Sequence, residues 1–115
     1  MEEKLTIDPK DAQDNKLLGI LAYFNLLFLV PYFAAKESPF AQFHANQGCV
    51  LCIVEIATMI LIRVFAYIPI IGWLIAILLY LLSIVFVVFA ILGIINAAKG
   101  EVKELPIIGK YRILK

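Results

Sequence analysis

Charge is almost absent from the middle of this sequence. Within residues 17–98 the only formally charged side chains are the neighbours Lys36 and Glu37 and the isolated Glu55 and Arg63, with His44 counted as neutral. Over the whole chain 63% of the residues are hydrophobic, whereas soluble domains contain about 45–50%. The sequence therefore predicts an integral membrane protein of the all-α class, built as a polytopic bundle of helices.

Other scarce features exclude whole classes of function. Cys49 and Cys52 have the spacing of half a zinc or redox motif, but no second pair exists, so packing is their expected role. The net charge of +1 argues against a nucleic-acid partner. The sequence contains no nucleophile beside a base, no phosphate-binding loop and no paired carboxylates. We therefore expect no enzyme activity and no catalytic, cofactor-binding or metal-binding residues.

Three apolar tracts are long enough to cross a bilayer as helices, which takes about 20 residues each. The predicted order is a polar N-terminal segment (residues 1–16), spans over about residues 17–35, 46–67 and 72–98, and an interfacial C-terminal tail (residues 99–115). Ser38 followed by Pro39 is a helix-start signal before the second span. Pro31 predicts a kink or an early end of the first span. A short re-entrant piece at residues 68–73 is the alternative to a simple turn.

Lysine and arginine near the span ends set the orientation, because they bias a loop towards the cytoplasm. With three spans, the side that carries the tail has slightly more of them than the side that carries the N-terminus. We therefore expect a multi-pass protein of the cytoplasmic (inner) membrane with a cytoplasmic C-terminus. The residues expected to anchor it at the interfaces are Arg63, Tyr67, Tyr111 and Arg112.

A polar stripe runs down the predicted second helix, because His44, Gly48 and Glu55 fall within about 40° of one another at 100° per residue. Antiparallel packing would bring Asn25 of the first span to a depth similar to that of Glu55, where the two side chains could hydrogen bond. The candidate polar seam consists of His44, Gln47, Gly48, Glu55, Thr58 and Asn25.

Glu55 is the most informative member of the seam, because an ionisable group within hydrocarbon costs at least about 2.5 kcal/mol and usually faces a partner or water. Three interpretations stay open. Glu55 holds helices together with Asn25, Tyr80 and Ser83, or it is a proton or substrate site in a polar cavity, or it joins subunits.

Several short motifs resemble those of a known family. They are Leu18-Gly19-Ile20-Leu21-Ala22-Tyr23, Phe43-His44-Ala45-Asn46-Gln47-Gly48, Ile68-Pro69-Ile70-Ile71-Gly72-Trp73, Gly93-Ile94-Ile95-Asn96-Ala97-Ala98-Lys99-Gly100 and Leu105-Pro106-Ile107-Ile108-Gly109. The chain resembles a small prokaryotic membrane-protein family of unknown function that is similar to the twenty-kilodalton subunit of the chloroplast inner-envelope protein translocon. The resemblance implies a helical bundle in a bacterial or archaeal inner membrane and a part in moving polypeptides.

The resulting hypothesis is a non-enzymatic, self-assembling component of a protein-translocation or membrane-assembly system. The alternative is a small-molecule or proton-coupled transporter that uses the seam around Glu55. The expected partners are the lipid bilayer and either further copies of the chain or other membrane proteins.

Overall fold

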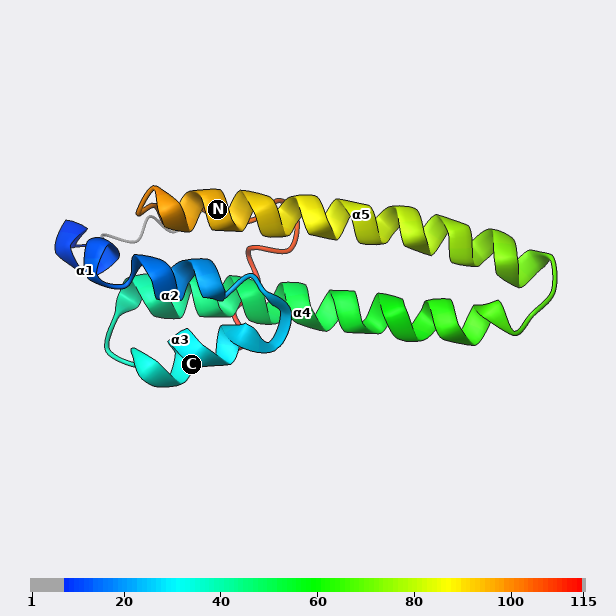
Figure 1. Cartoon of the computed structure of the whole chain (residues 1–115), viewed down its shortest axis with the longest axis horizontal. Helices are drawn as coiled ribbons and strands as arrows, with labels where there is room; N and C mark the ends of the chain where they lie inside the picture. The colour runs from blue at the N-terminus through cyan, green and yellow to red at the C-terminus, as the bar shows by residue number, and fades with distance from the viewer. Residues whose placement is uncertain (1–7, 115) are drawn as a thin grey trace.

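The computed structural model describes residues 8–114, and all regular structure in this range is helical, with no strand. The elements in chain order are α1 (Pro9–Asp14), α2 (Lys16–Leu21), the 3-10 helix η1 (Asn25–Phe28), α3 (Leu29–Ala34), α4 (Pro39–Ala66) and α5 (Ile71–Ala98). The molecule is elongated, 54 × 26 × 21 Å, and its short helices gather at one end (Figure 1). The predicted all-α class is confirmed.

Two 28-residue helices, α4 and α5, form an antiparallel hairpin along the molecule (Figure 1). Ser38 caps α4 as its sequence predicts: its Oγ accepts the Ala41 N–H at 3.0 Å, and Pro39 lies in the first turn, where a missing N–H costs nothing. Residues 67–70 turn the chain, and the Trp73 indole donates across this turn to an α4 carbonyl at 3.2 Å. Both helices are long and apolar enough to cross a membrane. They correspond to the second and third expected spans.

The expected first span, residues 17–35, is not one helix, and the count of three spans is not confirmed. Its apolar tract forms α2, η1 and α3, which double back as a short hairpin (Figure 1). Asn25 adopts a positive φ of 59° at the reversal, a conformation that asparagine tolerates better than most residues. A proline inside a continuous helix would remove a hydrogen bond and clash with the preceding turn. Because α3 begins at Leu29, Pro31 instead lies in a first turn, where neither cost arises.

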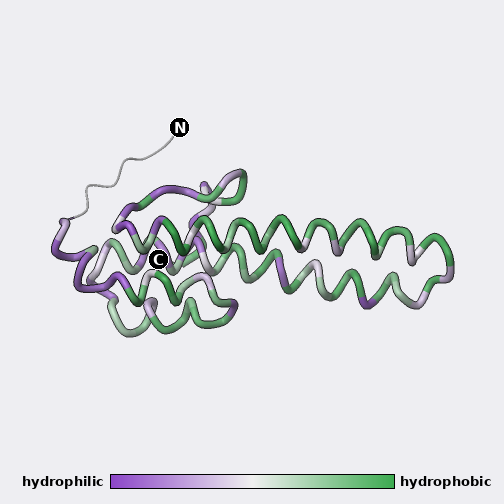
Figure 2. Tube along the Cα trace, turned by 45° about the horizontal axis from the view of Figure 1, so that its top comes forward, coloured by the Kyte–Doolittle hydropathy of each residue, from purple (hydrophilic) through white to green (hydrophobic). Residues whose placement is uncertain are grey.

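The short elements form a head at the end of the molecule opposite the 67–70 turn. We define the head as α1, α2, η1, α3 and the tail (residues 99–114), packed on residues 39–52 of α4 and on the last turns of α5. Every residue from Phe40 to Cys52 except Gln42 is buried, whereas in the rest of α4 only Thr58 and Ile62 are. Figure 2 shows most polar segments collected at the head and a mostly apolar hairpin beyond it, in which short hydrophilic stretches interrupt one helix.

The end of α2 reaches the centre of the head through very close contacts with both long helices. A Cβ on Gly48 of α4 would lie 1.8 Å from the carbonyl oxygen of Ala22. A Cβ on Gly93 of α5 would lie 2.2 Å from the Tyr23 ring. Glycine is therefore required at both positions for the head to close around α2.

Replacing Gly48 by alanine should loosen the head, because the added methyl must displace the Ala22 backbone at a cost of about 1–3 kcal/mol. Cys49 and Cys52 are free and buried, so their rate of labelling by a maleimide in detergent measures how often the head opens. We expect Gly48→Ala to raise this rate by on the order of tenfold. Ala57→Val adds bulk at an exposed position of the same helix and is the matched control. Equal labelling rates in the two variants would contradict the packing described.

Candidate functional site

His44 lies at the centre of the head and is fully buried. Its Nε2 lies 2.8 Å from the Glu101 carbonyl oxygen and its Nδ1 lies 2.6 Å from the Tyr23 hydroxyl. A carbonyl only accepts, so Nε2 carries the proton and Nδ1 accepts from Tyr23. A tyrosine hydroxyl is protonated at neutral pH, so Tyr23 can serve as this donor. The rings of Tyr23, Phe40 and Phe43 meet the imidazole edge-on. His44 therefore joins α2 and the start of the tail to α4.

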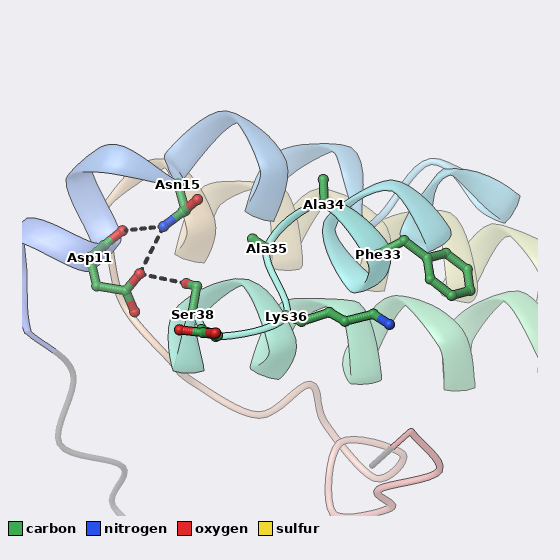
Figure 3. A pocket seen from close by; sticks show the side chains of 8 residues that line it. Asp11, Asn15, Phe33, Ala34, Ala35, Lys36 and Ser38 are labelled. Atoms are coloured by element: carbon green, nitrogen blue, oxygen red, sulfur yellow. Dashed lines mark hydrogen bonds between the residues drawn. The ribbon is translucent and has the colours of Figure 1, made fainter.

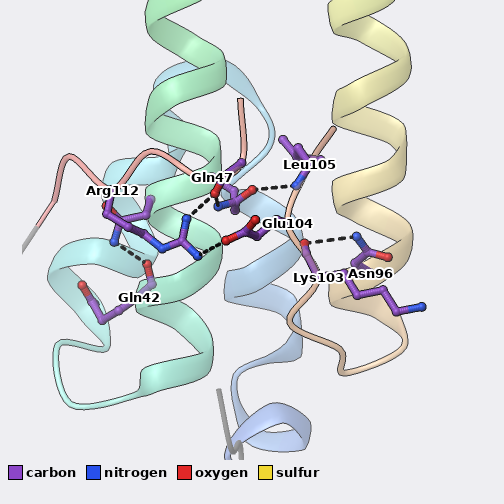
Figure 4. A network of polar contacts seen from close by, with 9 residues as sticks. Gln42, Gln47, Asn96, Lys103, Glu104, Leu105 and Arg112 are labelled. Atoms are coloured by element: carbon purple, nitrogen blue, oxygen red, sulfur yellow. Dashed lines mark hydrogen bonds and ion pairs between the residues drawn. The ribbon is translucent and has the colours of Figure 1, made fainter. Parts of the chain in front are cut away.

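Gln47, one turn further along α4, holds the next part of the tail. Its Nε2 donates to the Gly109 carbonyl at 2.9 Å, and its Oε1 accepts the Leu105 N–H at 2.9 Å (Figure 4). Gln47 is fully buried and Leu105 is 2% exposed, so water does not compete for these bonds. The Leu105–Gly109 turn is also closed on itself, because the Gly109 N–H donates to the Leu105 carbonyl at 3.0 Å.

Asn46 completes the set of α4 side chains that bind the tail backbone. Its Oδ1 accepts the Leu114 N–H at 2.7 Å, and its Nδ2 donates to the Gln42 carbonyl at 3.1 Å. We call His44, Asn46 and Gln47 the tail clamp. The three side chains come from one short stretch of α4 and bind backbone groups spread over residues 101–114. The tail is thus folded onto α4, and its expected position at the membrane surface stays a prediction.

Arg112, one of the expected interface anchors, makes contacts within the head. It pairs with Glu104 at 2.9 Å, donates to the Gly109 carbonyl and lies over the Phe43 ring at 5.1 Å (Figure 4). Tyr111 is exposed, with the Lys110 ammonium 5.5 Å from its ring centroid.

The other two expected anchors, Arg63 and Tyr67, are exposed near the turn at the far end of the hairpin. That position is compatible with anchoring, which stays a prediction for these two residues.

The lower part of the candidate seam does not join the tail clamp. Asn25 accepts the Cys52 thiol at 3.2 Å rather than pairing with Glu55, and Thr58 donates to the Val54 carbonyl of its own helix at 2.7 Å. Glu55 is half-buried, and no side chain within residues 8–114 hydrogen bonds or ion-pairs with its carboxyl group. The structure therefore brings together His44, Gln47 and Gly48 and leaves Glu55 apart.

Neither of the other polar residues expected to share the glue role bonds to a neighbouring helix through a described contact. Ser83 donates to the Leu79 carbonyl of its own helix at 3.1 Å. Tyr80 is 60% exposed on the hairpin surface.

Asp11 is a link that the sequence did not reveal. Its carboxylate accepts the Ser38 hydroxyl at 2.5 Å, the Asn15 amide at 2.8 Å and the Phe40 N–H at 3.1 Å, so it ties α1 to the start of α4 (Figure 3). An open cleft of about 560 Å³ lies beside it, lined also by residues 33–38. The only signal in the sequence was the favourable place of an acid in the first turn of α1.

Within residues 8–114, no group of three or more His, Cys, Asp or Glu side chains is placed so that it could hold a metal ion. The two cysteines are buried and free. The polar side chains of the head described above hydrogen bond its segments to one another.

A model of the magnetosome magnetite crystal formation protein family matches residues 14–113, which include both long helices and the tail clamp. The chain belongs to this family. No curated protein and no solved structure matches it. The match confirms the expectation that the chain belongs to a small prokaryotic family. Nothing supports the expected similarity to the chloroplast translocon subunit.

Replacing Gln47 by leucine in this magnetosome-family protein should release the tail, because Leu105 N–H and the Gly109 carbonyl then lose their partner. Each unsatisfied buried group costs about 1–3 kcal/mol. Trypsin cleavage after Lys103 and Lys110 in detergent measures the release, and we expect it to accelerate by on the order of tenfold. Gln13→Leu, at an exposed position of α1, serves as the control. Unchanged cleavage in Gln47→Leu would show that the clamp does not hold the tail.

Proposed function

We propose that the protein is a non-enzymatic structural protein of a prokaryotic cytoplasmic membrane, which it crosses twice, and that it associates with membrane partners through Glu55. The observation that carries the proposal is the bare α4–α5 hairpin. Its large side chains are apolar and exposed; Ile60, Leu78 and Ile84 are 57%, 65% and 59% exposed. An apolar surface of this extent needs lipid or another protein to cover it.

The length of the hairpin supports a placement with the head on one side of the bilayer. About 20 helical residues cross the hydrocarbon, and counted back from the 67–70 turn they end on α4 near Asn46, in the tail clamp. Tyr67 and Trp73 then lie at one interface and the clamp at the other, which suits aromatic and polar side chains. The irregular tail lies outside the hydrocarbon, where protein or water satisfies its backbone groups.

Charge supports a cytoplasmic head. Every lysine and arginine within residues 8–114 lies in the head or at its edge, except Arg63. The 67–70 turn carries no charge at all. Under the positive-inside rule this asymmetry favours a cytoplasmic C-terminus more strongly than a three-span arrangement does.

A C-terminal tag should be digested by protease in inside-out membrane vesicles and protected in right-side-out vesicles. The opposite pattern is expected at the turn: Tyr67→Cys, in a chain with Cys49 and Cys52 replaced by alanine, should react with a membrane-impermeant maleimide only in right-side-out vesicles. A tag protected in inside-out vesicles would contradict the orientation. Reaction of Tyr67→Cys from the same side as the tag would contradict the two-span hairpin.

Glu55 supports association within the membrane, because its carboxyl group lies about halfway along α4 with no side-chain partner in the described chain. A polar group in hydrocarbon gains from a hydrogen bond to a neighbouring helix.

The part of the seam formed by His44, Gln47 and Gly48 is filled by the tail and the end of α2. This filling favours a scaffold over a transport pathway through the monomer. For the magnetite formation after which the family is described, we propose a role in organising the membrane, because the exposed surface of the long hairpin is mostly apolar.

Glu55→Leu should convert an oligomer in native-like lipid to a monomer, whereas Glu55→Gln, which keeps a hydrogen-bonding group, should remain associated. Native mass spectrometry from lipid nanodiscs measures both. A wild-type chain that is monomeric and binds no membrane protein would overturn the assignment of Glu55. Proton-coupled uptake into liposomes that Glu55→Gln abolishes would favour the transporter instead.

A further inference from the structure

The α2–η1–α3 hairpin adds apolar bulk to one half of the molecule only. At its tip Phe24, Leu26 and Leu27 are 48%, 58% and 44% exposed, and Phe33 on the returning helix is 60% exposed. The other half contains α4 and α5 alone (Figures 1 and 2). The protein is therefore thicker across the head-side half than across the far half.

The depth of this tip follows from its contact with α4. Asn25 hydrogen bonds to Cys52, which lies six residues beyond Asn46 towards the turn. At 1.5 Å rise per residue the tip reaches about 9 Å below the level of Asn46. That is well within one leaflet of a hydrocarbon layer about 30 Å thick. It is also the depth to which apolar faces of interfacial helices insert.

We propose that the α2–η1–α3 hairpin is a wedge in the head-side leaflet, and that the protein therefore prefers membranes that are strongly curved and convex on the head side. The inference rests on the two-span placement proposed above. Extra protein cross-section in one leaflet expands that leaflet relative to the other, and curvature that is convex on the expanded side relieves the mismatch. Insertion of apolar groups at this depth is sensitive to curvature for the same reason.

Acyl chains of the head-side leaflet fit this surface better than a protein partner does. The tip lies at the level of Ile53 and Ile56 on α4, which are 49% and 40% exposed, so the apolar belt of the long hairpin continues onto it. Both ends of the short hairpin are polar, with Lys16 near Asp14 and Lys36 beside Glu37, which suits the headgroup region. An apolar tip between two polar ends matches the polarity profile of a lipid leaflet.

The test uses the full chain, with a C-terminal tag, in vesicles of phosphatidylethanolamine and phosphatidylglycerol with a broad range of diameters. An impermeant dye labels outward tags, and a second dye added after permeabilisation labels the rest. Imaging single vesicles then gives the ratio of head-out to head-in molecules at each diameter. We expect this ratio to rise several-fold from the largest to the smallest vesicles. A ratio that does not depend on diameter overturns the wedge.

Matched alanine variants assign the effect to the tip. Phe24→Ala/Leu26→Ala/Leu27→Ala should flatten the dependence on diameter. Ile77→Ala/Leu78→Ala/Leu81→Ala, which removes similar bulk from exposed positions nearer the turn, should leave it intact. The reverse pattern would contradict the proposal. Slow thiol labelling of Cys49 and Cys52 verifies that each variant keeps its head, and the wild-type result stands without any variant.

Two further outcomes separate this inference from the proposed function. N-terminal and C-terminal tags on opposite faces of the vesicle would remove the two-span placement itself, whereas tags on one face with a flat ratio would remove only the wedge. A photoreactive group at Leu26 should crosslink to lipid in cell membranes. Crosslinking to protein there would show that a partner covers the tip.

Discussion

A backbone N–H or carbonyl group within a bilayer needs a partner inside the protein, and this constraint shapes the whole chain. Only α4 and α5 satisfy it along their own length. The irregular tail lies outside the hydrocarbon in the proposed placement and folds onto the first half of α4, where His44, Asn46 and Gln47 bind four of its backbone groups. The same stretch of α4 provides Gly48, against which the end of α2 packs. This short stretch thus holds the end of α2 and the tail, whereas Asp11 ties α1 to the start of α4.

This arrangement gives the molecule two unequal halves. Most polar and charged groups of the described chain lie with the short helices, and the remaining hairpin has a mostly apolar surface interrupted by Glu55 and, near the turn, by Arg63. Because the head is closed by hydrogen bonds between its own segments, its polarity is structural. Within the hairpin, the Glu55 carboxyl group has no side-chain partner among the described residues, and the tip of the α2–η1–α3 hairpin leaves large apolar side chains exposed.

Local signals predicted much of the fold. The Ser38–Pro39 start of α4 and the limits of α5, expected at residues 72–98 and found at Ile71–Ala98, follow from capping chemistry and from the length of the apolar tracts. The break near Asn25 was missed because residues 17–35 also have the length of one span, and only Asn25 and Pro31 signal otherwise. The polar stripe on α4 was found, but its role was not. The bonds from Gln47 to the tail join residues 58 and 62 positions apart, which no local pattern predicts.

The central claim is that α2, η1 and α3 return to the side from which they enter, so that the chain crosses the membrane twice. Lys16 and Lys36 flank this segment, and labelling each as a single cysteine in a chain without Cys49 and Cys52 tests the claim directly. An impermeant maleimide applied to sealed inside-out vesicles should label Lys16→Cys and Lys36→Cys alike, and neither should react in right-side-out vesicles. Labelling of the two positions from opposite faces would mean that residues 17–35 span the bilayer, and it would contradict the account.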